Sequence, residues 1–184
     1  TYLAIGINPT TGLLAGNVLD ILRVSSPIIM IALGMTFVIA TSGIDLSVGS
    51  IMAVGGAVAM VTLSEIGQAE SFGAMAAAIG LAVLLGAVLG SINGLLVSVV
   101  GLQPFISTLV MMLAARGIAR VITGGQNTNA TNGPFKQIAN GQFFGLPISF
   151  VVAIALVIIV ALIMRRTALG LMIEAIGINP RASR

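Results

Sequence analysis

The chain has 184 residues, of which 58% are hydrophobic and 7% charged, and its mean hydropathy is +1.16. Soluble domains carry about a quarter charged residues, so eight basic and five acidic side chains are too few to cover a soluble domain of this size. The chain has no Cys and no His, which excludes disulfides, thiolate nucleophiles, His-dependent catalysis and the usual zinc sites. The five carboxylates are scattered, so neither a paired acid–base site nor a metal site is predicted.

The net charge of +3 comes from few residues, and no Lys/Arg-rich stripe with interleaved aromatics is present, so nucleic acid is not an expected partner. The first residues, TYLAIGINPTTG, have neither Met nor a basic segment, which is not the pattern of a signal peptide. The last residues, NPRASR, are polar and add no closing element. We therefore expect a fragment of a longer chain, cut at both ends.

Long uncharged stretches dominate the sequence, and a bilayer-spanning helix needs about 20 apolar residues. They predict an all-α integral membrane protein, a polytopic bundle of transmembrane helices forming a single domain over residues 1–184. The apolar segments are expected at about 24–42, 47–63, 73–100, 104–123 and 148–164. Within the third segment, Gly86, Gly90 and Gly94 recur on one face, which predicts close helix packing and a central position for this helix.

The distribution of Lys and Arg predicts the orientation of the bundle. Arg165 and Arg166 follow the last segment together with two further arginines, so that side is expected to be cytoplasmic. Counting back, residues 124–147, which are rich in Gly and Asn, form an external loop, and residues 101–103 lie inside.

The first apolar run, GMTFVIATSGIDLSVGS at 34–50, is broken in its middle and carries a carboxylate there. Gly43 permits a turn, and Asp45 is then expected as an N-cap with Ser47 in the first helical turn. The alternative is a broken or re-entrant segment near 42–49 that lines a polar path. A lone Asp does not separate these two interpretations.

Four further polar side chains lie in apolar surroundings. Arg116 and Arg120 are four residues apart and share one helical face. Arg120 can snorkel to lipid headgroups, whereas Arg116 lies deeper and is expected to face the bundle interior or a wet cavity. Asn93 and Gln103 are each expected to make an interhelical hydrogen bond.

Residues 165–184, RRTALGLMIEAIGINPRASR, differ from the rest of the chain. Arg165 and Arg166 mark the exit from the membrane, and a short, weakly amphipathic stretch follows and ends at Asn179-Pro180. Composition alone leaves two interpretations open, a helix resting on lipid and a helix docked to a partner.

Three stretches, GMTFVIATSGIDLSVGS, LQPFISTLVMMLAARGIARVITGGQ and RRTALGLMIEAIGINPRASR, together resemble the permease subunits of bacterial ABC-type sugar importers, the ribose-permease family. The likeness extends over nearly the whole chain in the same order, and its details look most like the galactofuranose permeases. Members of that family contain more apolar segments than this chain, so the second half of such a permease is expected to be missing here.

The resemblance implies a subunit of an ATP-driven monosaccharide importer, a multi-pass protein of the bacterial inner membrane. Its implied partners are the lipid bilayer, a second identical or different permease subunit, a periplasmic sugar-binding protein and a cytoplasmic ATPase. The chain would bind no cofactor itself, since ATP and Mg²⁺ belong to the ATPase. Asp45, Asn93 and Arg116 are then predicted on the substrate path.

The resemblance also resolves the two interpretations of 165–184 in favour of a cytoplasmic coupling loop that docks on the ATPase. The residues predicted to serve that loop are Gly170, Glu174, Ala175, Gly177, Asn179 and Arg181. The alternative function is a stand-alone secondary carrier or channel for a small polar solute, which needs ion-coupling carboxylates at midplane, where only Asp45 is available. An intramembrane enzyme would need a catalytic set that the sequence lacks, so no enzyme activity is expected. Neutral sugars have no linear sequence code, so the sugar itself is not predicted.

Overall fold

The computed structural model describes residues 5–7, 14–66, 71–129 and 132–178. The helices are α1 (Asn17–Ala40), α2 (Val48–Ile66), α3 (Phe72–Ser98), α4 (Pro104–Ile122), α5 (Gly133–Asn140), α6 (Ile148–Arg166) and α7 (Ala168–Ile178). The strands are β1 (Gly6–Ile7), β2 (Leu14–Ala15), β3 (Gln142–Phe143) and β4 (Leu146–Pro147). Asn179 and Arg181 of the predicted coupling loop lie outside the described residues.

Five helices, α1, α2, α3, α4 and α6, have at least 18 residues and mean hydropathies between 1.5 and 2.9, so each is long and apolar enough to span a bilayer. The predicted polytopic helical bundle with a break near 42–49 is therefore confirmed. The first helix begins at Asn17, before the predicted start at 24. It does so because Asp20 lies in its first turn, where the helix dipole favours an acid, and Asp20 approaches Arg23 at 3.9 Å.

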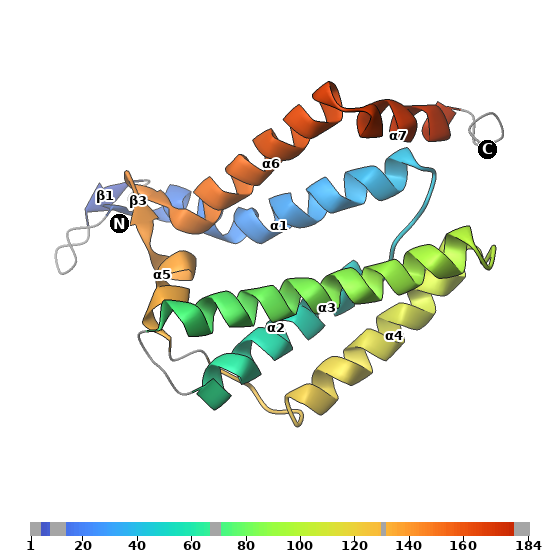
Figure 1. Cartoon of the computed structure of the whole chain (residues 1–184). Coiled ribbons are helices and arrows are strands. Elements are labelled where there is room, and N and C mark those ends of the chain that lie inside the picture. The colour runs from blue at the N-terminus through green and yellow to red at the C-terminus, as the bar shows by residue number, and fades with distance from the viewer. Residues whose placement is uncertain (1–4, 8–13, 67–70, 130–131, 179–184) are drawn as a thin grey trace. The chain divides into compact units, whose positions relative to one another are not determined.

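The chain forms two compact units, one of residues 1–42 with 137–184 and the other of residues 43–136. The second unit contains α2, α3 and α4, and α2 packs against both of the other two helices (Figure 1). Its buried cluster consists of Ala59, Leu63, Ala74 and Ala78, with Ala82 and Phe135 packed against them. Small side chains here allow close helix approach, as expected where packing rather than hydrophobic burial holds helices together.

The Gly face predicted for the third apolar segment does not carry this packing. A Cβ built on Gly86 meets Ile51 at 3.8 Å, but one built on Gly90 or Gly94 meets nothing within 4 Å. The predicted central position of α3 is wrong for the described residues, because α2 lies between α3 and α4 as their shared neighbour.

In the other unit, α1 packs along α6, and α7 contacts both of them (Figure 1). Part of the predicted external loop is ordered here as a hairpin, in which β3 pairs antiparallel with β4. Its two loop residues, Phe144 and Gly145, both have positive φ (50° and 82°), as a tight two-residue hairpin turn requires.

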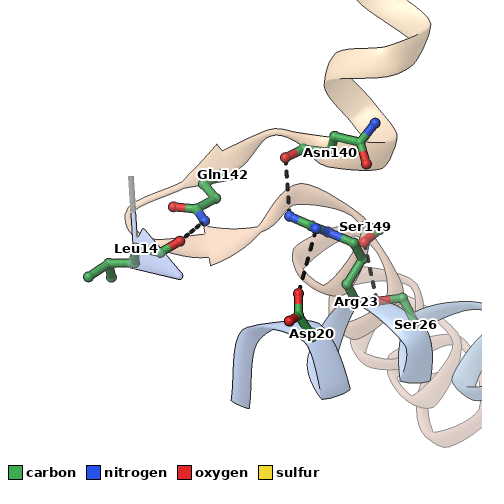
Figure 2. A network of polar contacts seen from close by, with 7 residues as sticks. All are labelled: Leu14, Asp20, Arg23, Ser26, Asn140, Gln142 and Ser149. Atoms are coloured by element: carbon green, nitrogen blue, oxygen red, sulfur yellow. Dashed lines mark hydrogen bonds and ion pairs between the residues drawn. The ribbon is translucent and has the colours of Figure 1, made fainter. Parts of the chain in front are cut away.

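Polar contacts connect β2 and α1 to the hairpin and to the residues on either side of it (Figure 2). Arg23 donates a hydrogen bond of 3.2 Å to the carbonyl oxygen of Asn140, and Gln142 donates to the carbonyl oxygen of Leu14. Ser26 of α1 lies 3.4 Å from the hydroxyl of Ser149 at the start of α6. The amino-terminal half of α1 is thereby tied to the segment that leads into α6.

Candidate functional site

The break between α1 and α2 covers residues 41–47, and its backbone turns at Ser42 rather than at Gly43. Ser42 has φ of 60°, in the left-handed region that non-glycine residues seldom adopt. Its amide donates to the carbonyl oxygen of Ile39 at 2.9 Å, which closes the end of α1. The prediction that Gly43 supplies the turn is therefore wrong.

Asp45 caps the turn through Ser47 and is not itself the N-cap. Its Oδ1 accepts hydrogen bonds from the backbone N–H of Ser47 at 2.7 Å and from the Ser47 hydroxyl at 2.6 Å. The carbonyl of Ser47 in turn accepts from the amides of Ser50 and Ile51, both at 2.9 Å, so Ser47 stands at the N-cap position of α2. An acid bonded to the amide two residues ahead is an Asx turn, a local backbone bond that Asp side chains readily make.

A buried chain of hydrogen bonds continues from Ser47 into the other two helices. Asn93 Nδ2 of α3 donates to Ser47 Oγ at 3.0 Å, and Ser107 Oγ of α4 donates to Asn93 Oδ1 at 3.1 Å. These three side chains are 0%, 6% and 3% exposed, respectively. The interhelical hydrogen bond predicted for Asn93 is confirmed. We call Asp45, Ser47, Asn93 and Ser107 the turn network.

Thr108 gives α4 a second connection to the same turn. Its hydroxyl donates to the Pro104 carbonyl at 2.8 Å and lies 3.4 Å from the carbonyl oxygen of Ile44. Ser107 and Thr108 were not predicted from the sequence, although two adjacent hydroxyls in the first turn of an apolar helix are an available signal. Gln103 is exposed, and its side chain makes no hydrogen bond to the described residues, so the bond predicted for it is wrong.

Beside the middle of α2 and the carboxyl-terminal end of α4, the two helices leave a hollow of about 760 Å³. One side of the hollow is formed by small residues and one Met from α2. The other side carries two arginines of α4, and the polar residues that come after α4 in the chain form its rim. The lining residues are Ala53, Gly56, Ala57, Met60, Arg116, Ala119, Arg120, Thr123, Gln126, Asn127, Thr128 and Asn129. We call this space the arginine hollow.

Arg116 and Arg120 both open into the arginine hollow and both are exposed. The wet cavity predicted for Arg116 is consistent with this position, but Arg120 lines the same space instead of lying apart from it. Arg116 does not join Asp45 and Asn93, because nine residues of helix separate it from Ser107, about 14 Å along the axis. The structure thus brings Asp45 and Asn93 together and places Arg116 elsewhere.

The segment after α6 is folded tightly against its own unit. Thr167 is extended (φ −123°, ψ 158°), which ends α6 and turns the chain into α7. A Cβ on Gly170 would overlap the carbonyl of Met164, and a Cβ on Gly177 would overlap the carbonyl oxygen of Ala40 at the end of α1. Both glycines are needed for these close approaches.

Much of the rest of α7 is exposed. Leu169, Leu171, Met172 and Glu174 are exposed, and Ala175 lies beside them. Glu174 also borders a hollow of about 620 Å³ at the corner with α6, together with Arg165 and Arg166. The segment therefore shows apolar side chains next to charges of both signs.

These features define a multi-pass membrane protein. Five helices are apolar and long enough to span a bilayer, polar groups are hydrogen-bonded between helices, and a short helix follows the two arginines at the end of α6. Residues 17–184 match the family described as "Branched-chain amino acid transport system / permease component", and the chain belongs to that family. This match, together with the relatives that follow, confirms the resemblance to the permeases of sugar importers.

Curated relatives agree with this assignment. The chain is 53% identical to the fructose import permease protein of Bifidobacterium longum over 100% of its length and 51% of the relative. It is 40% identical to the galactofuranose transporter permease protein of Escherichia coli over 94% of the chain and 49% of the relative. It is 39% identical to the Escherichia coli ribose import permease protein over 91% of the chain and 52% of the relative. The chain thus spans about half the length of these relatives. No solved structure matches it.

Proposed function

We propose that the chain is part of the membrane-spanning subunit of an ATP-driven monosaccharide importer in a bacterial inner membrane. The observation that carries this proposal is the match to fructose, galactofuranose and ribose import permeases along nearly the whole chain. Five membrane-spanning helices and the family match support it. The subunit would conduct the sugar and leave ATP hydrolysis, with its Mg²⁺, to a separate ATPase.

The partners in this proposal are a cytoplasmic ATPase, a periplasmic sugar-binding protein and a second permease subunit. We propose α7, with Gly170, Glu174, Ala175 and Gly177, as the helix that docks on the ATPase. Its exposed Leu171 and Met172 next to Glu174 support this role, because a buried apolar anchor with a charged rim is the usual composition of a docking surface.

Asp45, Asn93 and Arg116 stay predictions as residues of the sugar path. The side chains of Asp45 and Asn93 are already engaged in the turn network. We therefore propose that these two residues shape the path by fixing the start of α2, and that Arg116 alone of the three faces a space large enough for a solute.

Reconstitution tests the proposed function. The full-length permease is placed in liposomes with candidate ATPase and sugar-binding proteins from the same organism, and uptake of radiolabelled fructose, ribose and galactofuranose is measured. Uptake should need all three proteins and ATP. Uptake by the permease alone, driven by an ion gradient, would instead establish the secondary carrier and overturn the proposal.

A separate experiment tests α7. Leu171→Asp should reduce co-purification with the ATPase and sugar-stimulated ATP hydrolysis, because it puts a charge into an apolar contact. Glu174→Ala should be milder, since a partly exposed ion pair contributes about 0–1 kcal/mol. Gln103→Asp, at an exposed residue of the other predicted cytoplasmic loop, is the matched control. Normal complex yield and hydrolysis in Leu171→Asp would show that α7 does not dock there.

A further inference from the structure

The arginine hollow has the size and the walls of a binding site. Its volume of about 760 Å³ lies within the range of about 300–1,000 Å³ found for small-molecule pockets. The α2 side is lined by Ala53, Gly56, Ala57 and Met60, and a Cβ built on Gly56 meets no atom within 4 Å. Met60 is the one large side chain that α2 adds to the lining, and the volume given above is what remains open to a ligand.

Its charges have no protein counterpart among the described residues. No acidic residue lines the hollow, and the ion pair that the described residues contain, Arg23 with Asp20, lies in the other unit. Arg116 stands six residues before the end of a helix apolar enough to span a membrane, where an isolated charge is unfavourable. Both guanidinium groups therefore require water or a polar ligand, and each offers five N–H donors.

The rim of the hollow is shaped by two left-handed glycines. Gly124 and Gly125 have φ of 59° and 71°, and the amide of Gly125 donates to the carbonyl oxygen of Arg120 at 2.9 Å. This reversal ends α4 and directs residues 126–129 along the hollow, which they line. Gln126, Asn127, Thr128 and Asn129 add carboxamides and a hydroxyl that both donate and accept hydrogen bonds.

This combination favours a neutral, polyhydroxylated ligand over an anion. A fully deprotonated anion would use the N–H groups of the three carboxamides along the rim and leave their carbonyl oxygens to water. A sugar hydroxyl accepts from a guanidinium and donates to a carboxamide oxygen at once. The lining includes one large apolar side chain, Met60, and no aromatic ring, so an apolar ligand finds little contact.

We propose that the arginine hollow is a sugar-binding subsite, in which Arg116 and Arg120 donate to sugar oxygens and residues 126–129 select among sugars by their hydroxyl pattern. This inference rests on the proposed function and assigns a position to its substrate. By the Lys/Arg bias of the sequence the subsite lies toward the external side, where a sugar enters.

Protection of a single cysteine from a membrane-impermeant maleimide tests the subsite. Thr128→Cys is placed in the full-length permease, with any other cysteine of the full chain replaced, in the assembled and reconstituted importer. Free sugar at millimolar concentration, without binding protein, should slow the labelling saturably, reaching half the initial rate when the sugar concentration equals Kd. Lys136→Cys, at an exposed residue that does not line the hollow, is the control and should label at one rate throughout.

A second substitution links the protection to the arginines. Arg116→Gln in the Thr128→Cys protein should raise the half-protecting sugar concentration about tenfold, as expected for the loss of one charge-assisted hydrogen bond. Lys136→Gln, which removes one charge outside the hollow, should leave that concentration unchanged.

Three results would overturn the subsite. The first is an importer that takes up the sugar while the sugar leaves the labelling of residue 128 unchanged. The second is protection by sugar-free binding protein alone, which makes the hollow a docking surface for that protein. The third is protection by inorganic phosphate at the same concentration as sugar, which makes it an anion site. A failure of the proposed function is recognised separately, because the Thr128→Cys parent and the wild type would then both lack ATP-dependent sugar uptake.

Discussion

The turn network and the arginine hollow both involve α4 and the neighbourhood of α2, and the network also includes Asn93 of α3. Their polar side chains are nevertheless used in opposite ways. In the turn network Ser47, Asn93 and Ser107 are buried, and each is bonded to another side chain of the network. In the hollow Arg116 and Arg120 are exposed, and no acidic group of the described residues faces them. Polar residues in an apolar helix stabilise the fold where other protein groups satisfy their hydrogen bonds. Where no protein group satisfies those hydrogen bonds, the residues are available to a ligand.

The largest effect should come from removing the middle of the turn network. Asn93→Leu leaves the buried Ser107 hydroxyl without the acceptor to which it donates, and it removes one of the two side-chain bonds of Ser47, which keeps its bond to Asp45. A buried polar group left unsatisfied costs about 1–3 kcal/mol. The variant should therefore be strongly depleted from membranes and unfold at lower temperature in detergent. Ser98→Ala is the control, since its hydroxyl bonds only the Gly94 carbonyl of its own helix. If Asn93→Leu were as abundant in membranes as the wild type, the turn network would not be needed for stability.

A smaller loss is expected at the start of the network. Asp45→Leu removes the acceptor for the amide and the hydroxyl of Ser47, which should cost about 1–2 kcal/mol, as for loss of a helix cap. Asp45→Asn keeps a carbonyl oxygen in the same place and should retain most of the membrane level while transporting less sugar. Membrane abundance and uptake, measured in parallel, check both statements. Equal abundance and uptake in Asp45→Leu and wild type would contradict them.

Thr108 offers a finer test of the same region. Thr108→Val keeps the shape but removes a hydroxyl that chiefly bonds its own helix at Pro104, while its approach to Ile44 is long. The expected loss of stability is at most about 1 kcal/mol, read as a small shift in the detergent unfolding temperature. A loss as large as that of Asn93→Leu would mean that the Ile44 contact, not the chain of side chains, holds the turn.

The smallest effect on stability is expected for a substitution in the arginine hollow, where the comparison predicts a loss of binding without a loss of stability. Arg116→Gln should change the free energy of unfolding by no more than about 0.5 kcal/mol, as for an exposed side chain that has no partner among the described residues. Its thermal unfolding should match that of the wild type while sugar protection at residue 128 weakens. A clear loss of stability would instead place Arg116 among the packing residues.

The helices themselves were predictable from the sequence, because a run of about 20 apolar residues forms a helix in lipid whatever its neighbours are. The break at Asp45 was predictable for a similar reason, since a carboxylate in such a run needs a local partner. The left-handed residue was not, because Gly43 is the better candidate by propensity while the closing bond to Ile39 is made at Ser42.

The features that were not predictable depend on contacts between residues far apart in the sequence. Nothing in the spacing of Asn93, Ser47 and Ser107 shows that they form one chain of bonds, since that depends on how α2, α3 and α4 pack. The Gly face of α3 indicated a close neighbour that the described residues do not supply at Gly90 or Gly94. The hollow depended on a chain reversal at Gly124 and Gly125 that brings residues 126–129 beside Arg116.

The contact between Gly177 and the Ala40 carbonyl has a consequence for reading mutational scans. Any side chain at 177 meets the backbone at the end of α1 within the same chain, so that position will be intolerant in a library scored only for protein abundance. Intolerance at Gly177 is then a property of the isolated subunit. Intolerance that appears only in a growth selection on sugar, with abundance preserved, is the signature to look for at Leu171 and Glu174.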